Sequence, residues 1–298
     1  MSDVFISYSR KDIQFAQRIH QELEARERQP YLVIHSSIVG YKMKNIYLFV
    51  LLTILKVSLI FDGYCAKLAM VDYADQWTKV DALRQTLDKF KVEYDDYTKR
   101  IEKGELKFIP ENKLFFIGSM TTNNAALHQG LDKNAGVIQK FVKNGGIVIE
   151  PTQADQNEAN VDWLPDSLVC VRSDPDRAVF KIKKPNHSLF KAPNVLNEKS
   201  FQGWGHQGWP TVWEVIATQK GFDIIMESQG ETAIMEAEYG KGKFVMMALA
   251  PDKYHIVGND DNTKKQAGLF MENLLEAFLF SLPVEVSCKL TTKWASLK

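Results

Sequence analysis

The stretch Asn144-Gly145-Gly146-Ile147-Val148-Ile149 joins the end of one element to the start of the next. A helix is predicted before it, over residues 131–142, with Val137, Ile138 and Phe141 on one side. Glycine often follows a helix because it accepts the left-handed backbone conformation that ends one. The apolar run after the glycines is typical of a strand buried on both faces. A helix followed so closely by a buried strand predicts an α/β fold.

The same alternation extends over residues 67–282, which we interpret as one domain. Because strands that alternate with helices pair in parallel, we predict a three-layer, doubly wound, mostly parallel sheet of flavodoxin-like type. The turn Gly240-Lys241-Gly242 predicts an antiparallel extension. Strands are expected at 68–72, 92–94, 113–118, 147–149, 178–182, 222–227, 232–239 and 243–249, and further helices at 75–90 and 265–280. Residues 283–298 are a weakly specified tail.

The amino-acid composition limits which classes of partner and cofactor are expected. The chain has 298 residues, with 37 Lys+Arg and 37 Asp+Glu. This zero net charge argues against nucleic acid as a partner, because phosphate binding needs an excess of basic residues. The cysteines Cys65, Cys170 and Cys288 have no metal-ligand spacing and cannot all pair. No other motif indicates a cofactor or a metal, so we expect none.

A hydrophobic segment interrupts the chain ahead of this domain. Within residues 31–66, the run 46–61 is apolar except for Thr53, Lys56 and Ser58. Basic residues precede it and small residues follow it, which is typical of a signal peptide or an uncleaved membrane anchor. We therefore expect a membrane-associated or exported protein. The alternative is that 46–61 is buried core and the protein is cytoplasmic.

Residues 1–30 form a separate strand–loop–helix unit. The run Asp3-Val4-Phe5-Ile6-Ser7-Tyr8-Ser9-Arg10-Lys11-Asp12 resembles the opening motif of a TIR domain. TIR domains act as signalling adaptors or cleave NAD, and the resemblance places Arg10 and Lys11 in the loop beside the nucleotide. The pattern stops after Pro30, without the later glutamate helix of the family. Two interpretations remain open: a one-pass membrane protein whose truncated TIR-like unit recruits a partner, and an accidental joining of two unrelated reading frames.

The main domain resembles the class I glutamine amidotransferase-like superfamily. The resemblance lies in the strand 113–118, in Gly145-Gly146-Ile147-Val148-Ile149 and in Gly240-Lys241-Gly242-Lys243-Phe244-Val245. It is strongest toward the noncatalytic, trehalose-utilisation (ThuA-like) branches. The runs His187-Ser188-Leu189-Phe190 and Phe201-Gln202-Gly203-Trp204 are similar to a segment found with PIG-L-type sugar deacetylases.

The resemblance also bears on catalysis. In catalytic members a cysteine lies on the turn after the central strand, but the corresponding turn here is Glu150-Pro151-Thr152. We therefore predict a noncatalytic binding or interaction module that is associated with carbohydrate. One alternative is TIR-type signalling. A weaker one is a hydrolase that uses Glu150 and histidines; His187, His206 and His255 lack the spacing of a metal motif.

Open doubly wound sheets bind ligands beyond the carboxyl ends of their strands. A long aromatic loop is expected to fold over that edge and to stack on a sugar or another small polar ligand. The alternative is that the tryptophans fill the core and that Glu150 caps a helix. The predicted ligand-binding residues are Asp72, Tyr73, Ser119, Met120, Glu150 and Asp252 at the strand ends, with Trp204, His206 and Trp209 in the loop.

Overall fold

The computed structural model describes residues 67–74, 76–151, 161–173, 179–205 and 215–280. The TIR-like unit, the hydrophobic segment 46–61 and the tail from residue 283 lie outside the described residues. Within the described ranges, no helix combines the length and the apolar character needed to cross a membrane.

The parallel half of the sheet has the expected doubly wound order. Its five strands are hydrogen-bonded in the order β2-β1-β3-β4-β10, and every neighbouring pair is parallel. β1, β3, β4 and β10 are buried along almost their whole length, because helices cover both faces of a sheet of this kind. These strands are β1 (Lys67–Val71), β2 (Tyr94–Asp96), β3 (Asn112–Ile117), β4 (Ile147–Pro151) and β10 (Gly242–Met247).

The other half is the antiparallel extension, and the prediction of such an extension is confirmed. β9 (Glu231–Tyr239) folds back on β10 through a tight turn and pairs with it from Tyr239 to Ile234. The remaining strands are β8 (Asp223–Ser228), β7 (Val215–Lys220), β6 (Phe180–Ile182) and β5 (Val169–Ser173). These strands all form antiparallel pairs. The sequence analysis did not predict β5 or β7.

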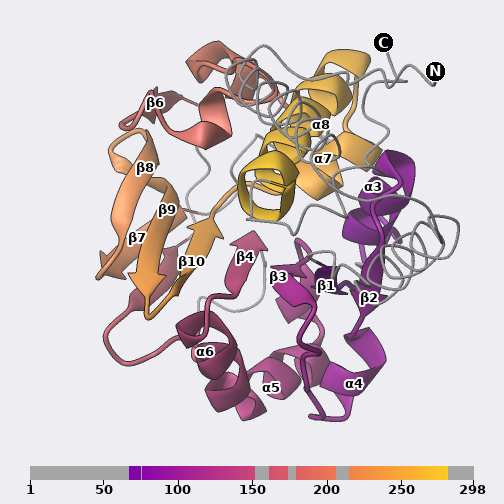
Figure 1. Cartoon of the computed structure of the whole chain (residues 1–298). Coiled ribbons are helices and arrows are strands. Elements are labelled where there is room, and N and C mark those ends of the chain that lie inside the picture. Colours follow the sequence, from indigo (N-terminus) through magenta and orange to yellow (C-terminus); the bar gives the residue numbers. More distant parts are fainter. Residues whose placement is uncertain (1–66, 75, 152–160, 174–178, 206–214, 281–298) are drawn as a thin grey trace, which may run out of the picture. The chain divides into compact units, whose positions relative to one another are not determined.

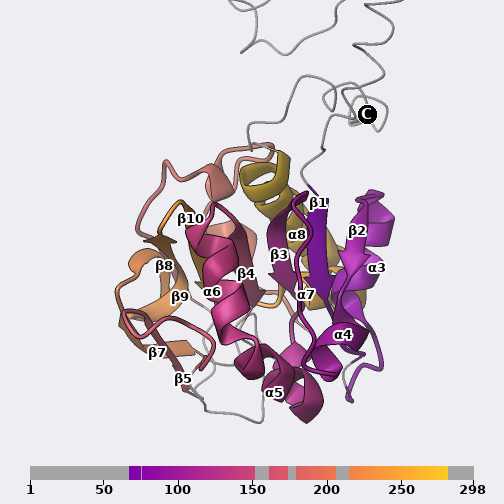
Figure 2. The same ribbon diagram turned by 60° about the horizontal axis from the view of Figure 1, so that its bottom comes forward.

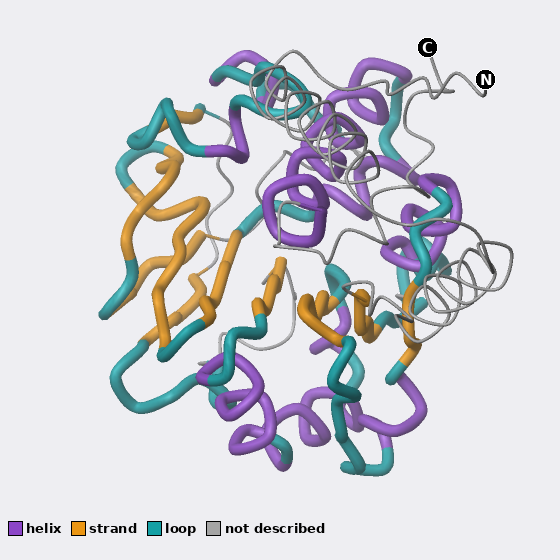
Figure 3. The backbone as a smooth tube through the Cα atoms, viewed as in Figure 1, coloured by secondary structure: helices purple, strands orange, loops and turns teal. Residues whose placement is uncertain are grey.

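Two helical layers enclose the sheet (Figures 1 and 2). One face carries α3 (Ala82–Phe90), α7 (Pro251–Val257) and α8 (Asp261–Leu275), and α8 continues into a π-helical turn, η5 (Glu276–Phe280). The opposite face carries α4 (Thr98–Glu102), α5 (Ala125–Lys133) and α6 (Ala135–Lys143). Figure 3 shows these helices on the two sides of the strands. The three-layer prediction is confirmed.

Three short 3₁₀ turns complete the described elements. They are η2 (Thr121–Asn123), η3 (Ser188–Phe190) and η4 (Glu198–Phe201).

Two predicted boundaries near the first helix are wrong. The helix expected at 75–90 begins only at Ala82, because Lys79 has a left-handed φ of 61° that a right-handed helix cannot contain. The strand expected at 92–94 begins at Tyr94, because the Val92 amide still donates to the Leu87 carbonyl in the helix end.

The helix expected at 131–142 is also corrected, since Asn134 divides this region into α5 and α6. The Asn134 side chain donates to the Gly130 carbonyl (2.7 Å) and accepts the Leu106 amide (3.2 Å). The prediction that a glycine terminates the helix before β4 is confirmed at the C-terminus of α6. Gly145 has a φ of 107°, and its amide donates to the Val142 carbonyl.

A partly buried ionic cluster connects the antiparallel extension to the parallel half of the sheet. Glu236 of β9 accepts a hydrogen bond from Lys243 of β10 (2.9 Å) and lies 3.3 Å from His187 Nε2. Burial alone would raise the pKa of Glu236, but the bonds from His187 and Lys243 lower it to about 2. The carboxylate is therefore stabilised in its charged form.

At neutral pH, Glu236→Gln should lower the free energy of unfolding by about 1–2 kcal/mol, allowing for partial solvent screening. A depressed folded pKa gives stability that is present above the ordinary value of 4.5 and is lost as the pH falls toward about 2. Urea denaturation across this range should show the two proteins converging. Glu238→Gln, at an exposed partner of the same lysine, is the control and should have little effect. A difference that does not vary with pH would contradict the assignment.

The fragment 67–298 should fold without residues 1–66, since every described strand and every helix that covers the sheet lies after Ala66. We expect a soluble fragment with one cooperative thermal transition in circular dichroism. An insoluble fragment, or one that melts without cooperativity, would mean that the first 66 residues belong to the core.

Candidate functional site

Three predicted residues from separate strand ends meet at the carboxyl edge of the sheet. Ser119 follows β3, and its amide (2.9 Å) and hydroxyl both donate to the carboxylate of Asp252, which follows β10. Asp72 follows β1 and accepts the amides of Tyr73 and Arg84, each at 2.8 Å. Asp72, Ser119 and Asp252 are at most 3% exposed. We call these three residues the edge network.

The edge network closes the place where strand order reverses, between β1 and β3. A Cβ atom at Gly118 would lie 2.5 Å from Asp72 Oδ1, so a side chain there would not fit. Burial and the nearby charge of Asp252 raise the pKa of Asp72 well above its usual range. Burial also raises the pKa of Asp252, although hydrogen bonds from Ser119 oppose this rise. The edge network is thus a buried, hydrogen-bonded structural contact at the strand ends.

Met120 turns the chain sharply after β3. It has a left-handed φ of 68° and is buried, which is a strained conformation for a residue with a side chain. Asn124 then begins α5, where its side chain accepts the amides of Ala126 (3.0 Å) and Leu127 (3.2 Å). This turn and cap direct one side of α5 toward the end of β4.

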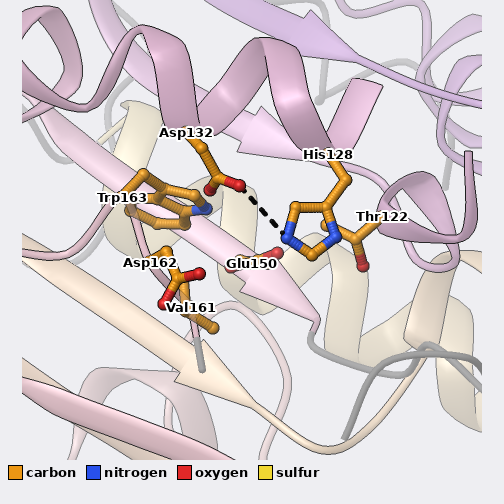
Figure 4. Close-up of a pocket in the computed structure, with 7 residues that line it drawn as sticks. All are labelled: Thr122, His128, Asp132, Glu150, Val161, Asp162 and Trp163. Carbon is orange, nitrogen blue, oxygen red and sulfur yellow. Dashed lines mark ion pairs between the residues drawn. The ribbon is translucent and has the colours of Figure 1, made fainter. Parts of the chain in front are cut away.

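A small pocket lies there, between α5, the end of β4 and the segment before β5 (Figure 4). His128 and Asp132 come from successive turns of α5, and His128 Nε2 lies 3.3 Å from Asp132 Oδ2. Asp162 and the buried Glu150 complete the polar lining. We call these four residues the pocket cluster. Thr122, Val161 and Trp163 form the rest of the wall.

The pocket cluster is rich in negative charge. Burial raises the pKa of Asp132, the positive charge of His128 lowers it, and the charge of Asp162 raises it again. Asp132 Oδ1 is shielded from solvent and has no hydrogen-bond donor among the described residues. The cluster has three carboxyl groups and one imidazole, so it favours neutral or cationic occupants over anions.

Trp204 lies away from this pocket and inside the core. It is 2% exposed, packs against Phe201 and Tyr254, and donates from its indole nitrogen to the Ser200 carbonyl (2.9 Å). Its ring is therefore covered in this structure. The other two loop residues of the prediction, His206 and Trp209, lie outside the described residues.

The structure therefore divides the predicted site residues into separate groups. Asp72, Ser119 and Asp252 form the edge network, Met120 is the buried turn beside it, and Tyr73 is partly exposed next to Asp72. Glu150 alone joins the pocket cluster.

The histidines weighed in the sequence lie in separate places. His187 pairs with Glu236, and His255 stacks on Phe90 with its Nδ1 2.9 Å from the Lys264 carbonyl oxygen. Burial lowers the pKa of His255. In the part of the chain that the structure describes, the metal-ligand grouping is His128, Asp132 and Asp162.

Sequence reasoning missed these three residues because it placed the start of the helix at Leu131. A signal was present, since His128 and Asp132 are four residues apart and neighbours on one helical face. Asp162 could not be found in this way, because it reaches the pocket only through the fold.

No family model matches this chain, and no curated protein matches it. The chain is similar to a solved glutamine amidotransferase from Thermotoga maritima, at 11% identity and a TM-score of 0.42, over 72% of this chain and 98% of that one. It is similar to a cytoplasmic protein from Salmonella typhimurium LT2, at 11% identity and a TM-score of 0.46, over 72% and 99%. A β-galactosidase from Bacillus circulans sp. alkalophilus has 11% identity and a TM-score of 0.42, over 76% of this chain and 33% of that one. Likeness at such identities concerns the fold alone.

Asp252→Ala should lower the free energy of unfolding by about 2–4 kcal/mol, because two buried donors of Ser119 lose their acceptor at about 1–3 kcal/mol each. Urea denaturation at neutral pH measures this loss. Asp223→Ala is the matched control, since this exposed carboxylate pairs only at the surface with Lys184 and should cost less than about 1 kcal/mol. Equal stability of the two variants would mean that the edge network does not hold the strand ends together.

Proposed function

We propose that this chain is a noncatalytic binding module that holds a small, hydroxyl-rich ligand at the ends of β3 and β4. The observation that carries the proposal is the position of Glu150. This buried carboxylate lies near the end of β4, at the position where the glutamine amidotransferase resemblance would place the nucleophilic cysteine, and it lines the pocket together with His128 and Asp162.

The polar groups of the pocket suit hydroxyl groups. Carboxylates accept hydrogen bonds from hydroxyls, and bonds to a charged acceptor are about twice as strong as neutral ones. The imidazole of His128 adds a nitrogen that can donate or accept, depending on its tautomer. A phosphate or carboxylate ligand would instead meet like charge from Glu150 and Asp162.

The size of the pocket limits what enters it. The volume open to the centre of a water-sized group is about 10 Å³, which is roughly what one water molecule needs. We infer that a single hydroxyl group of a sugar or polyol enters the pocket, while the rest of the ligand lies at its rim.

The noncatalytic character follows from the same residue. Glu150 lacks the thiolate that forms the acyl intermediate of catalytic amidotransferases. The one cysteine in the described ranges, Cys170, is buried in β5 and lies outside the pocket lining. A second candidate, a hydrolase with Glu150 and His128 as acid and base, is favoured by the presence of both residues in one pocket.

Three further expectations remain proposals about the whole chain. We propose that residues 46–61 bring the protein to a membrane or into export. We propose that the TIR-like unit around Arg10 and Lys11 recruits a protein partner. We also propose that the resemblance at Phe201-Gln202-Gly203-Trp204 marks an association with carbohydrate metabolism.

Binding is tested by titrating neutral sugars, amino sugars and polyols into the full chain, with EDTA present. Tryptophan fluorescence is a suitable signal because Trp163 lines the pocket, and calorimetry gives the affinity. At least one neutral or amino sugar should bind, and Glu150→Gln should weaken it about tenfold or more, because a charged acceptor is lost. Glu238→Gln, an exposed change of the same kind, should leave the affinity unchanged. Absence of binding throughout the panel, or stronger binding of sugar phosphates, would overturn the proposal.

The hydrolase is separated from the binding module by incubating the parent with glycosides and amides of any sugar that binds. Product formation that Glu150→Gln and His128→Gln each abolish, with melting midpoints unchanged, would favour the hydrolase. Recovery of intact ligand would favour the binding module.

A further inference from the structure

We propose that His128, Asp132 and Asp162 form a site for one divalent transition-metal ion of the zinc or manganese class. The inference rests on the proposed function only in sharing its pocket, because an ion there would present a binding position to ligand hydroxyls. Each residue offers one ligand atom, and the three atoms lie within 4.8 Å of one another.

The separation within α5 already suits an ion. Zinc ligands lie about 2.0–2.2 Å from the metal, so two ligand atoms at a tetrahedral angle are about 3.3–3.6 Å apart. The distance from His128 Nε2 to Asp132 Oδ2 is 3.3 Å. The two side chains form an ion pair at this distance. The same spacing would let both bind one common ion.

The placement of these two ligands on rigid structure supports the site. His128 and Asp132 are four residues apart on α5, which the Asn124 cap fixes at its start. Figure 4 shows their side chains directed toward each other from the helix. Little ordering cost therefore opposes binding at this pair.

The third ligand comes from outside the helix and is more adaptable. Asp162 is exposed and lies in the segment before β5, so its carboxylate can approach the helical pair by a change of rotamer. Three protein ligands leave a further position for water or a ligand hydroxyl, as in catalytic zinc sites.

The surroundings of Asp132 give a second observation that points to a cation. Its Oδ1 atom is shielded from solvent without a donor in the described ranges, although a buried oxygen of this kind normally has one. An ion between the three side chains would neutralise the charges of Asp132 and Asp162.

The ligand types select the class of ion. Calcium and magnesium prefer sites made only of oxygen atoms, whereas imidazole nitrogen suits zinc and similar transition metals. One imidazole with two carboxylates is therefore expected to prefer zinc or manganese over magnesium. Glu150 lies beside the site and adds negative charge to it.

The test titrates zinc, manganese, magnesium and calcium chlorides into the full chain by calorimetry, without sugar and after EDTA treatment. One zinc or manganese ion should bind per chain, and magnesium should bind more weakly. Asp162→Asn and His128→Gln should each weaken binding by more than about tenfold, since loss of even an outer-shell partner typically costs 10- to 100-fold. Asp162→Asn is the decisive variant, because an exposed residue can change without unfolding the protein.

Glu102→Gln is the matched control, since this carboxylate of α4 lies outside the pocket lining and pairs with the exposed Lys99. It should bind metal like the parent, and circular dichroism should give all variants the same melting midpoint without metal. Absence of zinc and manganese binding, or equal affinity in Asp162→Asn and the parent, would overturn the inference. Sugar binding in EDTA is measured separately, so either result can fail while the other stands.

Discussion

The pair of hydrogen bonds from Ser119 to Asp252 is the interaction on which the carboxyl edge of the sheet depends. Ser119 follows β3 and Asp252 follows β10, so one buried side chain joins segments that are 133 residues apart. Asp72 holds the start of α3 from the neighbouring strand. Because these polar groups are buried, each must find a partner. Ser119 and Asp252 bond to each other, and Asp72 accepts the amides of Tyr73 and Arg84.

This closure determines where a ligand can enter. Flavodoxin-like sheets bind ligands where strand order reverses, which here lies between β1 and β3. The edge network fills that position with packed side chains. The open pocket lies on the other side of β3, because the left-handed turn at Met120 brings α5 over the end of β4. At this edge of the sheet the edge network is therefore structural, whereas the pocket cluster is the candidate binding site.

The antiparallel extension depends on a second polar contact of the same kind. Glu236 faces Lys243 across the β9–β10 pair and also meets His187, which precedes η3. A partly buried carboxylate is stabilised in its charged form only when donors or positive charges lie close to it, and His187 and Lys243 lower the pKa of Glu236 in this way. The segment after β6 is therefore fixed to the sheet by charge as well as by the ring contact of Phe201 with Phe180 of β6.

The sequence by itself determined the α/β class, the parallel pairing and most strands of the sheet. Continuous apolar runs such as Phe115–Ile117 and Ile147–Ile149 mark strands covered on both faces, and Gly145 marks a helix end. These signals are local, since they depend on burial of successive residues and on the backbone freedom of glycine. The position of Glu150 near a strand end could be predicted from the sequence for the same reason.

Only the tertiary structure decided which strand ends are closed and which are open. Periodicity could not place β5 and β7, whose pairing with distant strands stabilises them, nor the division at Asn134, which depends on the Leu106 amide. The burial of Trp204 also depends on partners distant in sequence, above all Tyr254. Likewise, Asp162 meets His128 and Asp132 only because the sheet brings the segment before β5 beside α5. Contacts between residues far apart in the chain leave no periodic pattern, so they emerge only when the chain is folded.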